Sequence, residues 1–170
     1  MPPATNRLAS LDPGAVGRAT ARRAYDRLAM LSVQLQPAMP PLPSLPDERL
    51  GETQIALTVA DLVRYAQTGD GDAEDVREQV QDIAVAVGPM RLAADPNDDL
   101  ELAVMAAQAR AILAEGSPAD AGLLGALAGV ASHHVRLLGR RGEIDITSAA
   151  DQRRWLAARG VPGFETKRRR

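Results

Sequence analysis

The sequence contains no cysteine among its 170 residues. This excludes a disulfide framework, a zinc site built on thiolates and a thiol nucleophile. The simplest expectation is a cytoplasmic protein, or one associated with a virion or its assembly if the chain comes from a phage. The first residues also lack the charged segment and apolar core of a signal peptide, so we expect none.

Aromatic residues are scarce, because only Tyr25, Tyr65, Trp155 and Phe164 are aromatic although 45% of the chain is hydrophobic. The core must therefore be aliphatic. Ala, Leu, Arg, Glu and Gln are abundant and favour helices, whereas β-branched and aromatic residues favour strands. We predict an all-α protein, a bundle of about five to six helices with a Pro-rich linker after the first helix.

Long apolar runs are also missing. The longest weakly polar run covers residues 121–131, and a helix that crosses a bilayer needs about 20 apolar residues. We therefore expect no membrane span and no membrane partner. Lysine is nearly absent too, since Lys167 is the only lysine among 20 basic residues. Together with the abundance of alanine, this points to a GC-rich genome, that of a bacterium or its phage.

The net charge of −2 hides an uneven distribution of charge along the chain. Residues 1–46 carry +3, residues 47–120 carry −11 and residues 121–170 carry +6. An acidic middle between basic ends is compatible with internal neutralisation, with head-to-tail assembly or with a basic end bound to nucleic acid.

Proline and charge divide the chain into four parts. We predict a basic N-terminal helix in residues 1–36, a polyproline II spacer in 37–46, an acidic helical core in 47–142, and a C-terminal helix with a basic tail in 143–170. Across such a stiff spacer, the first helix would stand away from the other helices.

The first helix is predicted to begin with Asp12 as its N-cap and Pro13 at its first position. An apolar stripe follows at helical spacing and is expected to face the core. The stripe consists of Val16, Ala24, Leu28, Leu31 and Leu35.

Further helices are predicted by apolar periodicity and by capping residues. They cover residues 47–67, the stretch after Asp72, 95–116, 117–138 and 148–159. Gly122, Gly125 and Gly129 lie close together on the fourth of these, which indicates close packing of another backbone. Residues 142–146 alternate polar with β-branched side chains and suggest a short strand or an extended link.

Pro37, Pro40, Pro43 and Pro46 share one edge of a polyproline II helix, because that helix has three residues per turn. A rigid spacer is one interpretation. The alternative is a partner-binding segment, since the spacing resembles a ligand for an aromatic-lined groove.

His133 and His134 form the only pair of histidines. Adjacent helical residues point about 100° apart, whereas chelation from one helix needs a spacing of three or four residues. We expect one histidine to be half-buried and the other exposed, with no metal site. A ligand-binding or acid–base role for either remains the weakest alternative.

The C-terminal region combines positive charge with aromatic rings, as phosphate contacts and base stacking would need. Its candidate nucleic-acid-binding residues are Arg153, Arg154, Trp155, Arg159, Lys167, Arg168, Arg169 and Arg170. The string from Gln152 through Pro162 resembles a pattern found in some small phage DNA-binding domains. The alternative is that Trp155 anchors a terminal helix while the tail pairs with acidic helices of the same chain.

No nucleotide-binding loop, exposed serine nucleophile or paired carboxylate motif stands out. We therefore expect no catalytic residues, no cofactor and no enzyme activity. The first functional hypothesis is a protein that binds protein partners or itself, as an adaptor or assembly component. The alternative is a nucleic-acid-associated protein that uses residues 153–170.

Overall fold

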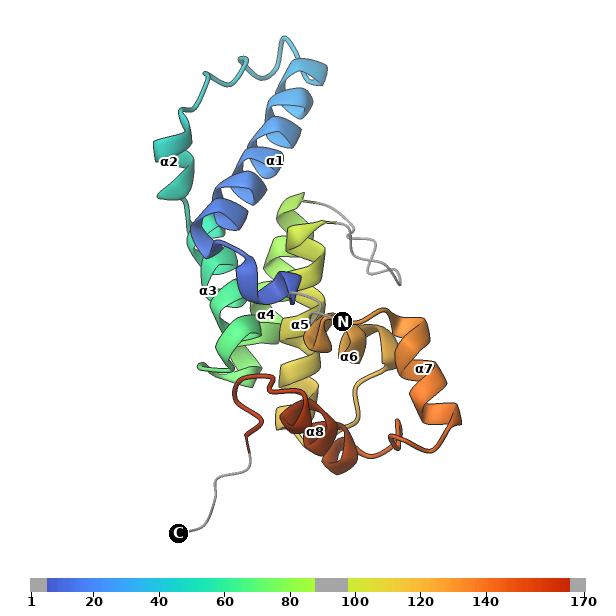
Figure 1. Cartoon of the computed structure of the whole chain (residues 1–170). Helices are drawn as coiled ribbons and strands as arrows, with labels where there is room; N and C mark the ends of the chain where they lie inside the picture. Colours follow the sequence, from blue (N-terminus) through green and yellow to red (C-terminus); the bar gives the residue numbers. More distant parts are fainter. Residues whose placement is uncertain (1–5, 88–97, 166–170) are drawn as a thin grey trace.

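The computed structural model describes residues 6–87 and 98–165, and in these residues it contains helices and no strand. The predicted all-α class is confirmed. The helices follow one another in the order shown in Figure 1: a 3₁₀ turn η1 (Arg7–Ser10), then α1 (Pro13–Gln34), α2 (Asp47–Gly51), α3 (Gln54–Thr68), α4 (Ala73–Val87), α5 (Asp99–Ala114), α6 (Ala121–Ala128), α7 (Ser132–Arg140) and α8 (Ala149–Ala158).

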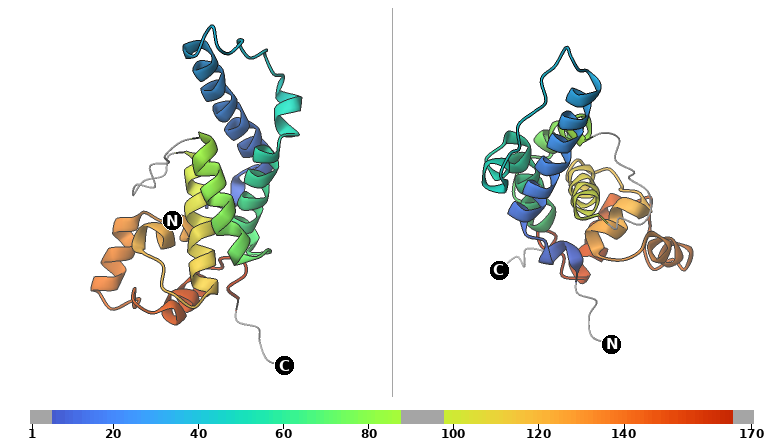
Figure 2. Two further views of the ribbon diagram at one scale, coloured as in Figure 1. Left: turned by 180° about the vertical axis from the view of Figure 1, so that it is seen from behind. Right: turned by 90° about the horizontal axis from the view of Figure 1, so that it is seen from above.

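Helix α5 lies at the centre of the molecule (Figures 1 and 2). It packs against α3 and α4 on one side and against α6 on the other. Its buried residues include five alanines, which allow the neighbouring helices to approach closely. Asp98 caps its first turn, with its Oδ1 accepting from the N–H of Leu100 at 2.8 Å. The predicted start at Asp95 lies outside the described residues.

Several predicted helix ends are confirmed. Asp12 caps α1 by accepting from the N–H of Gly14 at 2.9 Å, and Pro13 occupies the first helical position. Ser148 caps α8. Gly69 and Gly160 follow α3 and α8 with φ values of 82° and 70°, a backbone conformation that favours glycine.

Two predicted helices are each divided in two. The helix predicted over 47–67 is broken at Glu52 and Thr53, because the Thr53 hydroxyl caps a new helix by accepting from the N–H of Ala56. The helix predicted over 117–138 is α6 followed by α7, and its N-cap is Asp120 instead of Ser117. The strand suggested for residues 142–146 is also wrong. These residues form turns that bury Ile144.

The predicted separation of the first helix from the others is wrong for the N-terminal half of α1. This half packs directly on α3. A Cβ atom on Gly17 would lie 2.3 Å from the carbonyl oxygen of Ala56, so the two backbones are in close contact. The proline segment also returns along α1, where Arg22 donates to the carbonyl of Leu45 at 2.9 Å and pairs with Asp47 at 2.6 Å.

The C-terminal half of α1 behaves differently. It projects past the ends of helices α3, α4 and α5, as the views in Figures 1 and 2 show. Val16 and Ala24 of the predicted core stripe are buried, but Leu28, Leu31 and Leu35 are 55%, 44% and 53% exposed. The prediction that these three leucines face the core is wrong, because no described helix covers them.

Arg110 is the one arginine of α5 and only 4% of it is exposed. Its guanidinium donates to the carbonyl oxygens of Ala66, Gln67 and Pro162 at 2.8, 3.0 and 2.8 Å. It thereby joins the end of α3 to the segment after α8. Burial lowers the pKa of Arg110 to about 10, so the side chain remains charged at neutral pH.

No single helix in the described part of the chain is long and apolar enough to span a membrane. Helices α6 and α7 are long and apolar enough only when they are counted together, and the two are bent by 112° relative to each other.

Replacing Arg110 by methionine should destabilise the protein strongly. The substitution keeps the apolar stem but leaves three buried carbonyls without their charged donor, so we expect a loss of about 2–4 kcal/mol in the free energy of unfolding. Chemical denaturation followed by circular dichroism measures it. Arg64→Met, at an exposed pair with Asp61, is the matched control and should change stability by less than about 0.5 kcal/mol.

Candidate functional site

Helices α6 and α7 form a compact unit at one edge of the molecule (Figure 1). Residues 129–131 are the only residues between them, and the two helices are bent by 112° relative to each other. The chain turns at Gly129, whose φ of 68° lies in the left-handed region. The N–H of Val130 donates back to the carbonyl of Gly125 at 2.9 Å, which closes the end of α6.

Gly125 allows this turn because it has no side chain. A Cβ atom at this position would lie 2.6 Å from the carbonyl oxygen of Val130 and 3.3 Å from the nitrogen of Ser132. The glycines at 125 and 129 therefore serve the close approach of the next segment of the same chain. The sequence had indicated close packing here without showing that the partner follows directly in the chain.

The inner faces of both helices are apolar and belong to the core of the protein. They bury Leu124, Leu127, Val135 and Leu138. Two helices at about 90–120°, joined by a turn of three or four residues that contains glycine, constitute a helix-turn-helix motif. Helices α6 and α7 satisfy each of these geometric conditions.

The outer face of α7 is basic. His133, Arg136 and Arg140 are separated by three and four residues, so they lie on one side of the helix, and all three are exposed. Among the described arginines, only four have no hydrogen bond, ion pair or ring contact with the described residues. Two of the four are Arg136 and Arg140; the others are Arg18 and Arg27.

Gln152 of α8 fixes the position of this unit from inside. The side chain is fully buried. Its oxygen accepts from the N–H of Ala119 at 2.9 Å, and its nitrogen donates to the carbonyls of Ala119 and Ile146, each at 2.8 Å. One side chain thus holds the segment before α6 and the segment after α7 together.

The described residues of the predicted C-terminal site are engaged within the protein. Arg153 donates to the carbonyl of Leu113 at the end of α5, and Arg154 pairs with Asp151 at 2.6 Å. The guanidinium of Arg159 lies 4.9 Å from the ring centre of Trp155. Residues Lys167 to Arg170 lie outside the described part of the chain.

The other predicted candidates are dispersed. His133 is exposed and His134 is half-buried, as expected from their adjacent positions. Pro37, Pro40, Pro43 and Pro46 lie on the segment that returns along α1, far along the chain from α7. No cluster of three or more potential metal ligands occurs in the described residues.

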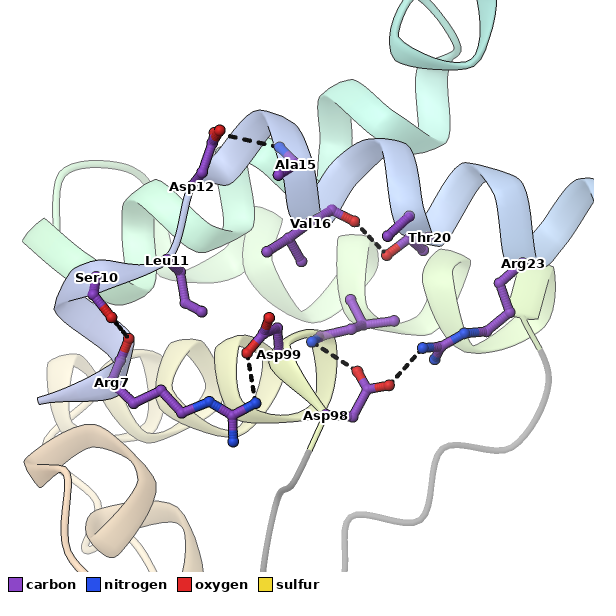
Figure 3. A pocket seen from close by; sticks show the side chains of 12 residues that line it. Arg7, Ser10, Leu11, Asp12, Ala15, Val16, Thr20, Arg23, Asp98 and Asp99 are labelled. Carbon is purple, nitrogen blue, oxygen red and sulfur yellow. Dashed lines mark hydrogen bonds and ion pairs between the residues drawn. The ribbon is translucent and has the colours of Figure 1, made fainter. Parts of the chain in front are cut away.

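A hollow of about 600 Å³ lies between η1, α1 and the start of α5 (Figure 3). Its charged groups satisfy one another: Arg7 pairs with Asp99 at 2.7 Å and Arg23 with Asp98 at 2.5 Å. Partial burial acts to raise the pKa of Asp98, but the hydrogen bond and charge of Arg23, with two backbone N–H groups, outweigh it and lower the pKa. These contacts connect α1 to α5 and account for the charged side chains of the hollow.

The chain matches no protein-family model, no curated protein and no solved structure.

Sequence reasoning missed Arg136 and Arg140, because Arg136 was placed inside one continuous helix over 117–138 and Arg140 beyond its end. The signal that could have revealed them is local. Gly129 ends a short apolar stretch, and glycine is the usual residue just past the end of a helix. Val135 and Leu138 keep the apolar period of Leu124 and Leu127, eleven residues earlier, so periodicity alone does not reveal the turn.

Gly125→Ala tests the close approach of α6 and α7. The added methyl group must displace the backbone around Val130, so we expect a loss of about 1–3 kcal/mol in the free energy of unfolding. Gly51→Ala, in a helix where the added atom meets only the flexible side chain of Arg18, is the control and should be neutral or stabilising. Equal losses in the two variants, measured by thermal and chemical denaturation, would contradict this account of the turn.

Proposed function

We propose that the protein binds double-stranded DNA by inserting α7 into the major groove. The observation that carries the proposal is the exposed pair Arg136 and Arg140 on the second helix of a helix-turn-helix unit, for which the described residues supply no partner. In such motifs the second helix enters the groove and the first crosses the backbone.

The dimensions and charge of α7 support this use. Its nine residues span about 13 Å at 1.5 Å per residue, and the major groove is about 12 Å wide. Arg136 and Arg140 can contact phosphate oxygens or guanine edges. His133 lies in the first turn, which is the part of a recognition helix that meets the bases. The N-terminus of α7 is the positive end of its helix dipole, which favours placing this end of the helix next to the anionic DNA.

The regions first predicted to bind nucleic acid have weaker support. Arg153 and Arg154 already interact with a carbonyl and a carboxylate of the protein, and binding DNA would replace these contacts. The tail from Lys167 to Arg170 stays a prediction, as an addition to α7. The adaptor function stays a prediction as well. It is supported by the exposed apolar side chains at the C-terminal end of α1.

Arg136→Ala together with Arg140→Ala should weaken binding to a fluorescent duplex DNA at least tenfold, as measured by anisotropy. Because the lost contacts carry charge, the slope of log affinity against log salt should become less steep by about 1–2. Arg49→Ala together with Arg64→Ala removes two exposed arginines on α2 and α3. This double variant is the charge-matched control and should bind like the wild type. Wild-type affinity in the double variant would refute the proposal.

A chain that ends at Glu165 separates α7 from the basic tail. We expect this truncated protein to bind more weakly but to remain sensitive to Arg136→Ala and Arg140→Ala, because the two regions contribute independently. If truncation alone abolishes binding in the same anisotropy assay, the tail is the DNA-binding element and the assignment to α7 is wrong.

A further inference from the structure

A second surface stands out at the opposite end of the molecule from α7 (Figures 1 and 2). We call residues 28–42, the C-terminal half of α1 and the segment that follows it, the apolar arm. Seven large apolar residues of the arm are between 38% and 61% exposed: Leu28, Met30, Leu31, Val33, Leu35, Met39 and Leu42. They are seven of the eleven large hydrophobic residues that are exposed in the described part of the chain.

The arm is also free of charge. No charged residue occurs between Arg27 and Asp47, although a quarter of all residues in the chain are charged. A surface that faces only water normally carries charges, whereas the centre of a protein interface is depleted of them and enriched in methionine. The combination of exposed leucine and methionine with absent charge is typical of a surface that another protein covers.

The arm has a defined shape. The Tyr25 hydroxyl donates to the carbonyl of Pro43, and Arg22 holds the carbonyl of Leu45 and the carboxylate of Asp47. The returning segment is therefore fastened to α1 near its base, and Leu28 and Leu31 are carried on the regular helical backbone of α1. A preformed surface of this kind loses little conformational entropy on association.

We propose that the apolar arm binds the arm of a second copy of this chain, in an antiparallel pair related by a two-fold axis. Identical surfaces without charge can meet without repulsion between like charges. Arg27 lies eight residues before Leu35, about 12 Å along the helix. Asp26 lies next to Arg27, so the base of the arm carries both signs of charge. An antiparallel arrangement therefore sets the charged base of each arm against the uncharged tip of the other, and keeps like charges of the two bases apart.

The position of the arm is compatible with the function proposed above, and the inference rests in part on it. Helix-turn-helix proteins commonly bind as two-fold dimers that contact two half-sites. Because the arm and α7 lie at opposite ends of the molecule, an arm-to-arm dimer leaves both copies of α7 accessible.

Sedimentation velocity of the full chain tests the proposal directly. The wild type should be a dimer, and Leu31→Ser with Leu35→Ser should raise the dimer dissociation constant at least tenfold while circular dichroism remains unchanged. Leu57→Ser with Val85→Ser, at side chains of α3 and α4 that are 50% and 76% exposed, is the matched double control and should remain dimeric. A wild type that stays monomeric at every concentration, or a dimer insensitive to the arm variant, would overturn the inference.

The absence of cysteine makes the antiparallel geometry testable as well. In such a pair, a residue halfway between the base and the tip of the arm, such as Leu31, faces its own copy. A residue at the tip, such as Leu35, faces the base of the other arm. Leu31→Cys should therefore form a disulfide-linked dimer under mild oxidation, whereas Leu57→Cys and Leu35→Cys should not. Equal cross-linking through Leu31→Cys and Leu35→Cys would overturn the antiparallel arrangement.

The two proposals fail separately. Arg136→Ala with Arg140→Ala should remain dimeric in sedimentation, because α7 lies outside the arm. A protein that dimerises through the arm but binds no DNA would refute the function proposed for α7 only. A monomer that binds DNA through α7 would refute the proposal for the arm only.

Discussion

The need to cover α5 on every side determines how the other helices are arranged. Eleven of its sixteen residues are buried, which a single neighbouring helix could not achieve. Helices α3 and α4 cover one side and α6 covers another. Five of the eleven buried residues are alanines, so these neighbours can approach closely and gain many weak contacts. Arg110 is charged and nevertheless buried, and it joins the same helix to the end of α3 and to the segment after α8.

The packing of α6 against α5 has a direct consequence for α7. The buried face of α6 and the turn at Gly129 fix the direction in which the chain leaves, and Gln152 holds the segments before and after the unit. The outer face of α7 is consequently presented to solvent by a rigid support. A recognition helix requires such a support, because its side chains must reach the groove in a fixed orientation.

The proposed DNA contact and the proposed arm contact rely on opposite physical properties. Helix α7 offers two arginines that pair with none of the described residues. Such charges favour a polyanion, and the attraction weakens in salt. The arm offers apolar side chains without charge, which favour association through the hydrophobic effect and depend little on salt. Their separation at the two ends of the molecule allows one chain to use both at once. The protein–protein hypothesis and the nucleic-acid hypothesis that the sequence suggested are therefore compatible with each other.

Local chemistry in the sequence was sufficient to predict the helical class and several helix ends. The composition favoured helices throughout, and Asp12, Ser148 and Gly160 act within a turn of their own positions. Breaks within helices were harder to predict. Thr53 and Gly129 lie inside apolar patterns that continue past them, and a periodic pattern does not show by itself whether the chain bends there.

The sequence by itself determined the class of fold, several of the caps and the absence of thiol chemistry, because these depend on residue identity and on neighbours a few positions away. Only the tertiary structure decided which apolar and which basic residues are left without partners. Leu28 and Val16 belong to the same stripe, yet only Val16 is covered. Arg153 and Arg140 are equally basic, yet Arg153 is bound by a carbonyl of α5. Whether a side chain is buried or paired depends on the assembled helices, because the residues that cover it or bind it lie far away in the sequence.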